Sequence, residues 1–432
     1  MAADPLAPSR KDWLFAAVAC QLAVVLIAGG TARPANVLVC FLAAMPVLGL
    51  LLAGTRSEPL AWPARLALAL YGLAWLQLVP LPPSVWTALP GRALAADVLL
   101  AAGMQPGWRP LALDPGAAGA ALASLAAPLV LLVAAGRLSA DERRILLRGI
   151  VGAALVMAVL GVVQRISGTL APYDIDHAGY ATGLFANRNH LAAFLASALL
   201  LLPALRKNER DRRSSPVMLA ASLLLFAGIL ATTSRAGIVL GLVAIVVSQI
   251  LWWRPSVRTV LGGGLALILA AVVLLQVPAL APVFDRFAGL AQDDRFHIAE
   301  TTLAAARAYF PWGSGWGSFV PVYMTFEDLD TLDGNFVVAA HNDYLQLMLE
   351  GGWLGLAVAM AAPLALIAFA AGKLQTRSGT ASWSLWWICA VLLAHSAVDY
   401  PLRTDALAAL LALAFAMQDN RRKPLPPGVG PD

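Results

Sequence analysis

The sequence predicts an all-α polytopic membrane protein with about twelve transmembrane helices. Of its 432 residues, 60% are hydrophobic and only 13% are charged, whereas soluble globular domains carry about 25% charged residues. The apolar residues gather in runs of about 20, the length that a helix needs to cross ~30 Å of hydrocarbon. Lysines and arginines gather in alternate connections between these runs, as in multi-pass proteins with a fixed orientation. We expect residues 1–432 to form a single integral membrane domain.

The apolar runs give the expected spans in order. They cover residues 13–31, 36–54, 61–79, 117–136, 146–165, 189–205, 216–233, 236–253, 259–277, 342–371, 382–398 and 404–419. The run at 342–371 is longer than a bilayer requires, so it is expected to tilt or to extend beyond the membrane. Cys20, Cys40 and Cys389 all lie inside these runs, and we expect them to be small buried hydrophobic residues, neither paired nor bound to metal.

The basic residues of the connections predict the orientation of the chain. With a cytoplasmic N-terminus, one side receives every lysine and most of the arginines, including the cluster at 206–213 and the C-terminal residues 421–423. The opposite side holds fewer, isolated arginines. Because positive charge marks the cytoplasmic side, both termini are predicted to be cytoplasmic.

The first long connection on the opposite side covers residues 80–116. Pro80, Pro82 and Pro83 disfavour a regular helix at its start, and Trp86 suits a membrane interface.

The second long connection covers residues 278–340 and is predicted to be a periplasmic subregion. Phe296, Leu303, Ala306 and Phe310 recur in it at helical spacing, so we expect a helix across the membrane surface. A glycine-aromatic turn at 311–319 follows.

Unusual polar residues collect on the face opposite the lysines. Arg188 and His190 open the run at 189–205, Arg235 lies in the tight turn before 236–253, and Arg403 lies in the turn between the last two runs. His341 and Asn342 open the run at 342–371, and Glu350 lies inside it. Ionisable groups in membrane segments are costly and usually functional, so this convergence predicts a site.

Three of these residues also have a structural explanation. Arg235 can anchor its hairpin at the interface, and Arg403 can simply pair with Asp399. His190 can cap its helix or bond to a neighbouring loop.

The same holds for the two polar residues of the 342–371 run. His341 can bond a backbone carbonyl at the helix start. Glu350 is expected about 13 Å deeper than His341 at the helical rise of 1.5 Å per residue. We therefore expect Glu350 to support the helix bundle and not to touch a substrate.

The chemistry of these residues suits a lipid-linked diphosphate. Arginine offers a fixed fork of donors for phosphate oxygens, so Arg188 and Arg235 can stabilise the charge of a departing diphosphate. A histidine can take the proton from an attacking hydroxyl. We predict that His341 is the catalytic base, with His190, Arg403, Asn342 and Glu350 as possible supporting residues.

Metal chemistry fits the sequence less well. Asp328-Leu329-Asp330 has an Asp-x-Asp spacing that can hold a divalent cation, but such a pattern arises easily in an acidic loop. The sequence has no His-Glu-x-x-His, paired-cysteine or Walker-type motif. Gly313-Ser314-Gly315 lacks the strand-turn-helix setting of a serine-hydrolase elbow. We predict neither a metal nor a cofactor.

Four stretches carry a family resemblance. They are Gly183-Leu184-Phe185-Ala186-Asn187-Arg188-Asn189-His190, Ser234-Arg235-Ala236-Gly237, Pro311-Trp312-Gly313-Ser314-Gly315-Trp316-Gly317, and His341-Asn342-x-x-Leu345 followed by Glu350-x-Gly352. With their order and the long loop before the histidine, they make the chain similar to the O-antigen ligase and O-antigen polymerase superfamily of bacterial envelope glycosyltransferases.

This resemblance implies a glycosyltransferase-C type of fold and a metal-independent, inverting transfer from an undecaprenyl-diphosphate-linked glycan. It implies the bacterial inner (cytoplasmic) membrane, with the site facing the periplasm. His341 matches the family's essential histidine, Arg188 and Arg235 match its diphosphate-binding arginines, and His190 and Glu350 match further family positions. The expected partners are the donor, a glycan acceptor and the lipid bilayer, with no nucleic acid.

The acceptor divides the superfamily. Ligases use lipid A-core in lipopolysaccharide biosynthesis, polymerases of O-antigen or exopolysaccharide use a second lipid-linked glycan, and protein O-oligosaccharyltransferases use protein serines. We favour the ligase and leave the other two open. The alternative from a different class is a transporter, such as a flippase for lipid-linked glycans. Transporters place polar residues near the bilayer midplane and often show two related halves, whereas here the polar cluster lies at one face and no repeat is visible.

Overall fold

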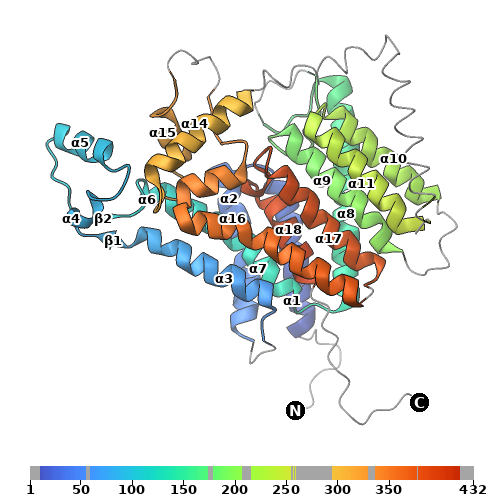
Figure 1. Cartoon of the computed structure of the whole chain (residues 1–432). Coiled ribbons are helices and arrows are strands. Elements are labelled where there is room, and N and C mark those ends of the chain that lie inside the picture. Colours follow the sequence, from blue (N-terminus) through green and yellow to red (C-terminus); the bar gives the residue numbers. More distant parts are fainter. Residues whose placement is uncertain are drawn as a thin grey trace, which may run out of the picture.

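The computed structural model describes residues 10–54, 59–173, 179–206, 216–253, 256, 258, 294–328, 336–376 and 378–418. These residues are mostly helical, with one two-stranded sheet among them (Figure 1). The predicted all-α membrane class is confirmed. Seven of the described helical segments are long and apolar enough to cross a membrane.

The observed helices follow the predicted runs closely. They are α1 (Arg10–Ala28), α2 (Pro34–Leu52), α3 (Trp62–Ala74) with the 3-10 turn η1 (Trp75–Leu78), α6 (Pro115–Ser124) with α7 (Ala126–Ala135), α8 (Ala140–Ser167), α9 (Arg188–Leu201) with η2 (Leu202–Leu205), α10 (Pro216–Ala231), α11 (Arg235–Trp253), α16 (Asp343–Thr376), α17 (Thr380–His395) and α18 (Asp405–Gln418). The predicted span at 259–277 lies outside the described residues. The count of twelve stays a prediction, because four of the helices are shorter than the 18 residues that we take as the minimum for a membrane span. These are α3, α10, α17 and α18.

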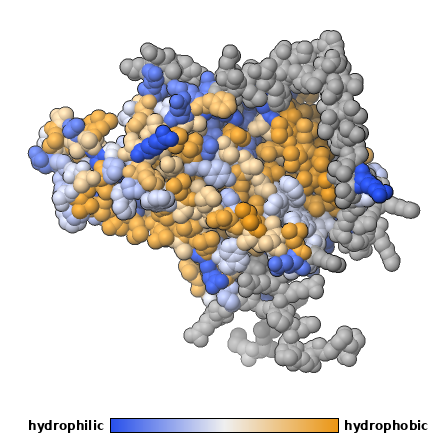
Figure 2. Space-filling model, viewed as in Figure 1, coloured by the Kyte–Doolittle hydropathy of each residue, from blue (hydrophilic) through white to orange (hydrophobic). Residues whose placement is uncertain are grey.

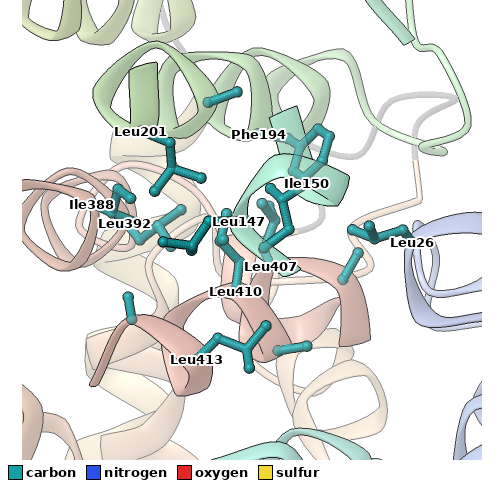
Figure 3. Packing of buried hydrophobic residues seen from close by; sticks show 14 of the residues in the cluster. Leu26, Leu147, Ile150, Phe194, Leu201, Ile388, Leu392, Leu407, Leu410 and Leu413 are labelled. Atoms are coloured by element: carbon teal, nitrogen blue, oxygen red, sulfur yellow. The ribbon is translucent and has the colours of Figure 1, made fainter. Parts of the chain in front are cut away.

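Helix α9 is the centre of the bundle. Every residue from Asn189 to Leu201 is buried, which is expected for a helix that is apolar all round. Helices α8, α10, α11 and α17 pack around it, and Figure 3 shows side chains of α9 meeting those of α8, α17 and α18. Small residues allow close approach: a Cβ on Gly237 of α11 would lie only 2.3 Å from the Ala192 Cβ of α9. The N-terminus of α9 is thereby fixed beside that of α11.

Local signals explain where several helices begin and end. Ser139 and Glu142 form a capping box at the start of α8, and Gly168 ends that helix in the left-handed conformation. The Asn187 side chain accepts a hydrogen bond from the Asn189 backbone N–H and caps α9.

The chain between α3 and α6 corrects one expectation. Strand β1 (Pro80–Leu81) pairs antiparallel with β2 (Arg109–Pro110), and α4 (Pro83–Trp86) and α5 (Ala93–Ala101) lie between them. Trp86, expected at a membrane interface, is buried, because its indole N–H donates to the Pro110 carbonyl and the Arg109 guanidinium lies over its ring.

A helix is present where one was expected, as α14 (Asp294–Tyr309), and α15 (Phe319–Met324) follows it. The buried face of α14 includes only part of the residues at helical spacing: Ala306 is buried, and Leu303 and Phe310 are half-buried. Ile298, Ala305 and Tyr309 are buried together with two threonines, whereas Phe296 is 68% exposed. The difference arises because α14 packs on α16 and α15. Among the cysteines, Cys40 and Cys389 are buried as expected, but Cys20 is exposed on α1.

Candidate functional site

The predicted site residues lie where four segments meet. These are the N-terminus of α9, the turn before α11, the start of α16 and the connection from α17 to α18. Two hydrogen bonds join them across the sequence: Asn189 Nδ2 donates to Asp399 Oδ2 at 2.6 Å, and Arg188 Nη1 donates to Thr233 Oγ1 at 3.1 Å.

His341 forms a pair with Asp399. Its Nδ1 lies 3.2 Å from Asp399 Oδ1, and the imidazole is 25% exposed while the carboxylate is fully buried. Burial disfavours the charged form of Asp399, but the hydrogen bond with His341 and the nearby His190, His395 and Arg295 outweigh it and hold the pKa of Asp399 well below its usual range. An ionised Asp399 favours the tautomer with the proton on Nδ1 of His341, which leaves Nε2 free to accept a proton.

The backbone presents His341 in an unusual conformation. Its φ is +47°, a left-handed value that is costly for a non-glycine residue and typical of functional sites. The neighbouring bonds hold it there. Asn342 Oδ1 accepts from the backbone N–H of Tyr344 and Leu345 at 3.0 and 3.1 Å and so caps α16, while Asn342 Nδ2 donates to the Ala397 carbonyl at 3.0 Å.

Tyr400 separates the two predicted histidines. Its ring centroid lies 5.0 Å from that of His190 and 5.0 Å from that of His341, in edge-on contacts. Burial raises the pKa of the Tyr400 phenol, so it stays neutral. His190 is buried, and neither ring nitrogen has a hydrogen-bond partner among the described residues. His190 therefore packs behind Tyr400 and does not face solvent beside His341.

The two predicted diphosphate-binding arginines begin adjacent helices. Arg188 is the first residue of α9, and its guanidinium also lies over the Tyr180 ring at 4.7 Å. Arg235 is the first residue of α11, which Ser234 caps by accepting from the Gly237 N–H at 2.9 Å. Helix N-termini carry positive partial charge, so two such ends with two arginines favour an anion.

Arg403 corrects a sequence expectation. It does not pair with Asp399, whose oxygens are taken by His341, Asn189 and the Tyr400 N–H. The short turn Pro401–Arg403 directs the guanidinium to α16 instead.

Arg403 forms ion pairs with two carboxylates of α16. Its Nη1 lies 3.1 Å from Glu350 Oε2 and its Nε lies 3.5 Å from Asp343 Oδ1, while Gln346 donates to Glu350 Oε1 at 3.0 Å. Burial lowers the pKa of Arg403, but the two carboxylates outweigh this and raise it. Glu350 thus bonds to the turn after Asp399 and does not contact His341.

Glu350 also sits at a break in α16. Gly352 has φ 55° and ψ −129°, a conformation suited only to glycine. The break frees two carbonyls, and the glycine-aromatic turn takes them: Ser314 N–H donates to Leu349 O and Gly315 N–H donates to Glu350 O, both at 2.9 Å. Irregular backbone is tolerated in a membrane protein where protein satisfies it in this way.

Gly352→Ala is expected to reduce accumulation of folded protein severely. A Cβ at Gly352 would lie 2.1 Å from the Pro311 carbonyl oxygen, in addition to the strained φ. Gly372→Ala on the same helix is the matched control, because nothing lies within 4 Å of its Cβ position. Size-exclusion profiles of the two variants in detergent test this; equal profiles contradict it.

Arg403→Met is expected to destabilise the protein by about 3–5 kcal/mol, since it leaves two buried carboxylates without a counter-charge. The melting temperature in detergent is the measurement. Adding Asp343→Asn and Glu350→Gln to Arg403→Met removes the unpaired charges and is expected to recover most of the loss. If the triple variant melts no higher than Arg403→Met, the ion-pair explanation is wrong.

Sequence reasoning missed Asp399 as the partner of His341, and with it Tyr400, Asn189 and Asp343. The turn at 399–403 was recognised as part of the cluster only through Arg403. A signal was present: Asp399-Tyr400-Pro401 ends an apolar run, and an acid at that position needs a partner.

Comparison with known proteins agrees with this architecture. The family model described as O-antigen ligase matches residues 220–360, a range that contains α11, the glycine-aromatic turn, His341 and the break in α16. No curated protein matches the chain. The superfamily carries glycosyltransferase-like enzyme activity. Residues 220–360 of this chain thus match the O-antigen ligase family, which supports placing the protein in the O-antigen ligase superfamily.

Proposed function

We propose that this protein transfers a glycan from undecaprenyl diphosphate to lipid A-core, with inversion at the anomeric carbon and without a metal ion. The observation that carries the proposal is the His341–Asp399 pair, at 3.2 Å, at the end of the bundle where Arg188 opens α9. This arrangement combines a base with an anion-binding group, as the transfer requires.

The proposed step balances as follows. Nε2 of His341 takes the proton of the acceptor hydroxyl, and the hydroxyl oxygen attacks the anomeric carbon of the donor sugar. The bond from that carbon to the diphosphate oxygen breaks, and the electron pair leaves with the diphosphate. Arg188 and Arg235 stabilise the departing anion, while Asp399 stabilises the imidazolium that forms on His341.

One observation favours the competing transporter: α16 is broken at Gly352, and transporters bind substrates at broken helices. Here, however, backbone N–H groups of the chain itself donate to the freed carbonyls of Leu349 and Glu350. The side-chain amide of Gln77 also donates to the Glu350 carbonyl, at 3.0 Å. The carboxylate of Glu350 is bonded to Arg403. A break filled in this way supports a rigid scaffold and does not provide a substrate site.

Reconstitution in vesicles tests the proposal. The purified protein is given lipid-linked glycan plus either lipid A-core or a second lipid-linked glycan, with and without EDTA. We expect glycan on lipid A-core, unchanged by EDTA. Product only on the second lipid-linked glycan indicates a polymerase, and translocation without a new glycosidic bond indicates a transporter. Loss of activity in EDTA favours coordination of a metal ion by Asp328 and Asp330. Of these two residues, Asp330 lies outside the described part of the chain.

A further inference from the structure

The segment between the two strands exposes a large apolar surface. We call residues 80–110, from β1 to β2, the apolar lobe; Figure 1 shows it projecting from the body beyond α3. Helix α5 buries none of its residues. The exposed side chains of the lobe include Val85, Leu94, Val98, Leu100, Met104 and Trp108, which are 45–68% exposed, and apolar residues cover much of the lobe in Figure 2. A contiguous exposed apolar patch marks a site of contact with a membrane or with another protein.

The lobe is held firmly, so its exposure is not a consequence of loose packing. The buried Arg92 donates through Nη2 to the carbonyls of Leu111 and Gly313 at 2.6 and 3.1 Å. The strand pair closes its base, and a Cβ on Gly91 would lie 2.4 Å from the ring of Tyr309 on α14. These contacts fix the orientation of α5 relative to the body of the protein.

The lobe follows directly on an exposed apolar stretch at the end of α3. Leu73, Trp75, Leu76 and Val79, at the end of α3 and in the residues that lead into β1, are 43–59% exposed. Exposed apolar residues therefore occur both at the end of α3 and in the lobe.

The lobe carries few charged residues, as expected for a segment in contact with a membrane. Its charged residues are Arg92, Asp97 and Arg109. Arg92 is buried and Arg109 lies over the Trp86 ring, so Asp97 on α5 is the exposed charged residue of the lobe. The exposed rings of Trp75 and Trp108 are typical of the membrane–water boundary.

We propose that the apolar lobe is seated in the membrane leaflet at the candidate-site end of the helices, with α5 lying in the plane of the interface and Leu94 and Val98 among the acyl chains. The apolar side chains of a helix that lies in the interface enter the boundary between headgroups and acyl chains. Through Arg92 and Gly313 the lobe is joined to the turn that holds Leu349 and Glu350. Contact with the leaflet thereby fixes how far the elements outside the membrane lie from the start of α16. This inference does not depend on the proposed function.

Spin labelling tests the proposal in vesicles. A nitroxide is placed by Val98→Cys or Leu94→Cys in the full chain with Cys20, Cys40 and Cys389 replaced by alanine. Collision with oxygen, which concentrates in hydrocarbon, is compared with collision with a water-soluble nickel chelate. Val239→Cys on α11, where the native side chain is 51% exposed, is the lipid control, and Glu300→Cys on the exposed side of α14 is the water control.

We expect the accessibility ratio at Val98 and Leu94 to shift toward oxygen, as at Val239. A ratio at both positions that matches Glu300 overturns the proposal. Spectral broadening that disappears on dilution with unlabelled chain also overturns it, because a second copy then covers the lobe. The two lobe positions are tested separately, and each counts only when its variant elutes as the parent chain does, so a folding failure at one leaves the other decisive.

Discussion

Replacing His341 with alanine is expected to abolish glycan transfer, and Asp399→Asn is expected to lower the rate constant by 10²–10⁴-fold, the usual contribution of general acid–base catalysis. The physical reason is the pair at 3.2 Å: without the ionised carboxylate, His341 loses the group that selects its tautomer and stabilises its protonated form. The measurement is the rate of glycan transfer in vesicles at saturating donor.

His297→Ala is the control, because it removes an imidazole from α14, a helix that carries none of the predicted site residues. All three variants are expected to insert and accumulate as the parent chain does. Near-normal glycan transfer by His341→Ala rules out the proposed mechanism, whereas a loss of activity confined to misfolded protein shows that Asp399 acts only in folding.

The pH dependence of stability distinguishes these outcomes further. Because the pKa of Asp399 is lower in the folded chain than in the unfolded one, its ionisation stabilises the fold above the ordinary carboxyl value of about 4 and stops doing so as the pH falls through the folded value. The difference in melting temperature between the parent chain and Asp399→Asn is therefore expected to decrease as the pH falls below about 4. A difference that stays constant as the pH falls below about 4 shows that the ionised Asp399 does not stabilise the fold.

Replacing either arginine at the helix N-termini is expected to reduce transfer by about 10²–10³-fold, the cost of removing one group that stabilises a developing anion. Arg188→Ala also removes the bond to Thr233, and Arg235→Ala leaves the Ser234 cap of α11 in place. Lysine at either position keeps the charge but loses the planar fork, so Arg188→Lys and Arg235→Lys are expected to retain part of the activity. The measurement is again the transfer rate with a lipid-linked donor.

Arg165→Ala provides the matched control. Arg165 is an exposed arginine near the C-terminal end of α8, so its removal changes the net charge without touching the cluster. If Arg165→Ala reduces transfer as much as Arg188→Ala and Arg235→Ala, the effect is one of general surface charge and the assignment of these two arginines to the diphosphate fails.

The apolar pattern was sufficient to predict where the helices lie. Runs such as 189–205 and 236–253 correspond to α9 with η2 and to α11, because a span requires a fixed length of apolar residues. Pattern alone identified only part of the buried face of a helix, as α14 shows: Ala306 of the helical pattern is buried, but Phe296 is exposed. The helices that pack on α14, which are α15 and α16, come from later parts of the chain, and their packing selected the face with Ile298 and Tyr309.

By itself, the sequence determined the membrane class, the positions of the helices and the polar residues that open them, because hydrophobicity and cost of burial are properties of local composition. Only the tertiary structure decided the partners. It paired His341 with Asp399, gave Arg403 to Asp343 and Glu350, and filled the break at Gly352 with the glycine-aromatic turn. Each of these contacts joins residues that are distant along the chain. Hydrogen bonds and ion pairs form only where three-dimensional packing brings donor and acceptor within about 3 Å, a distance that spacing along the chain does not specify.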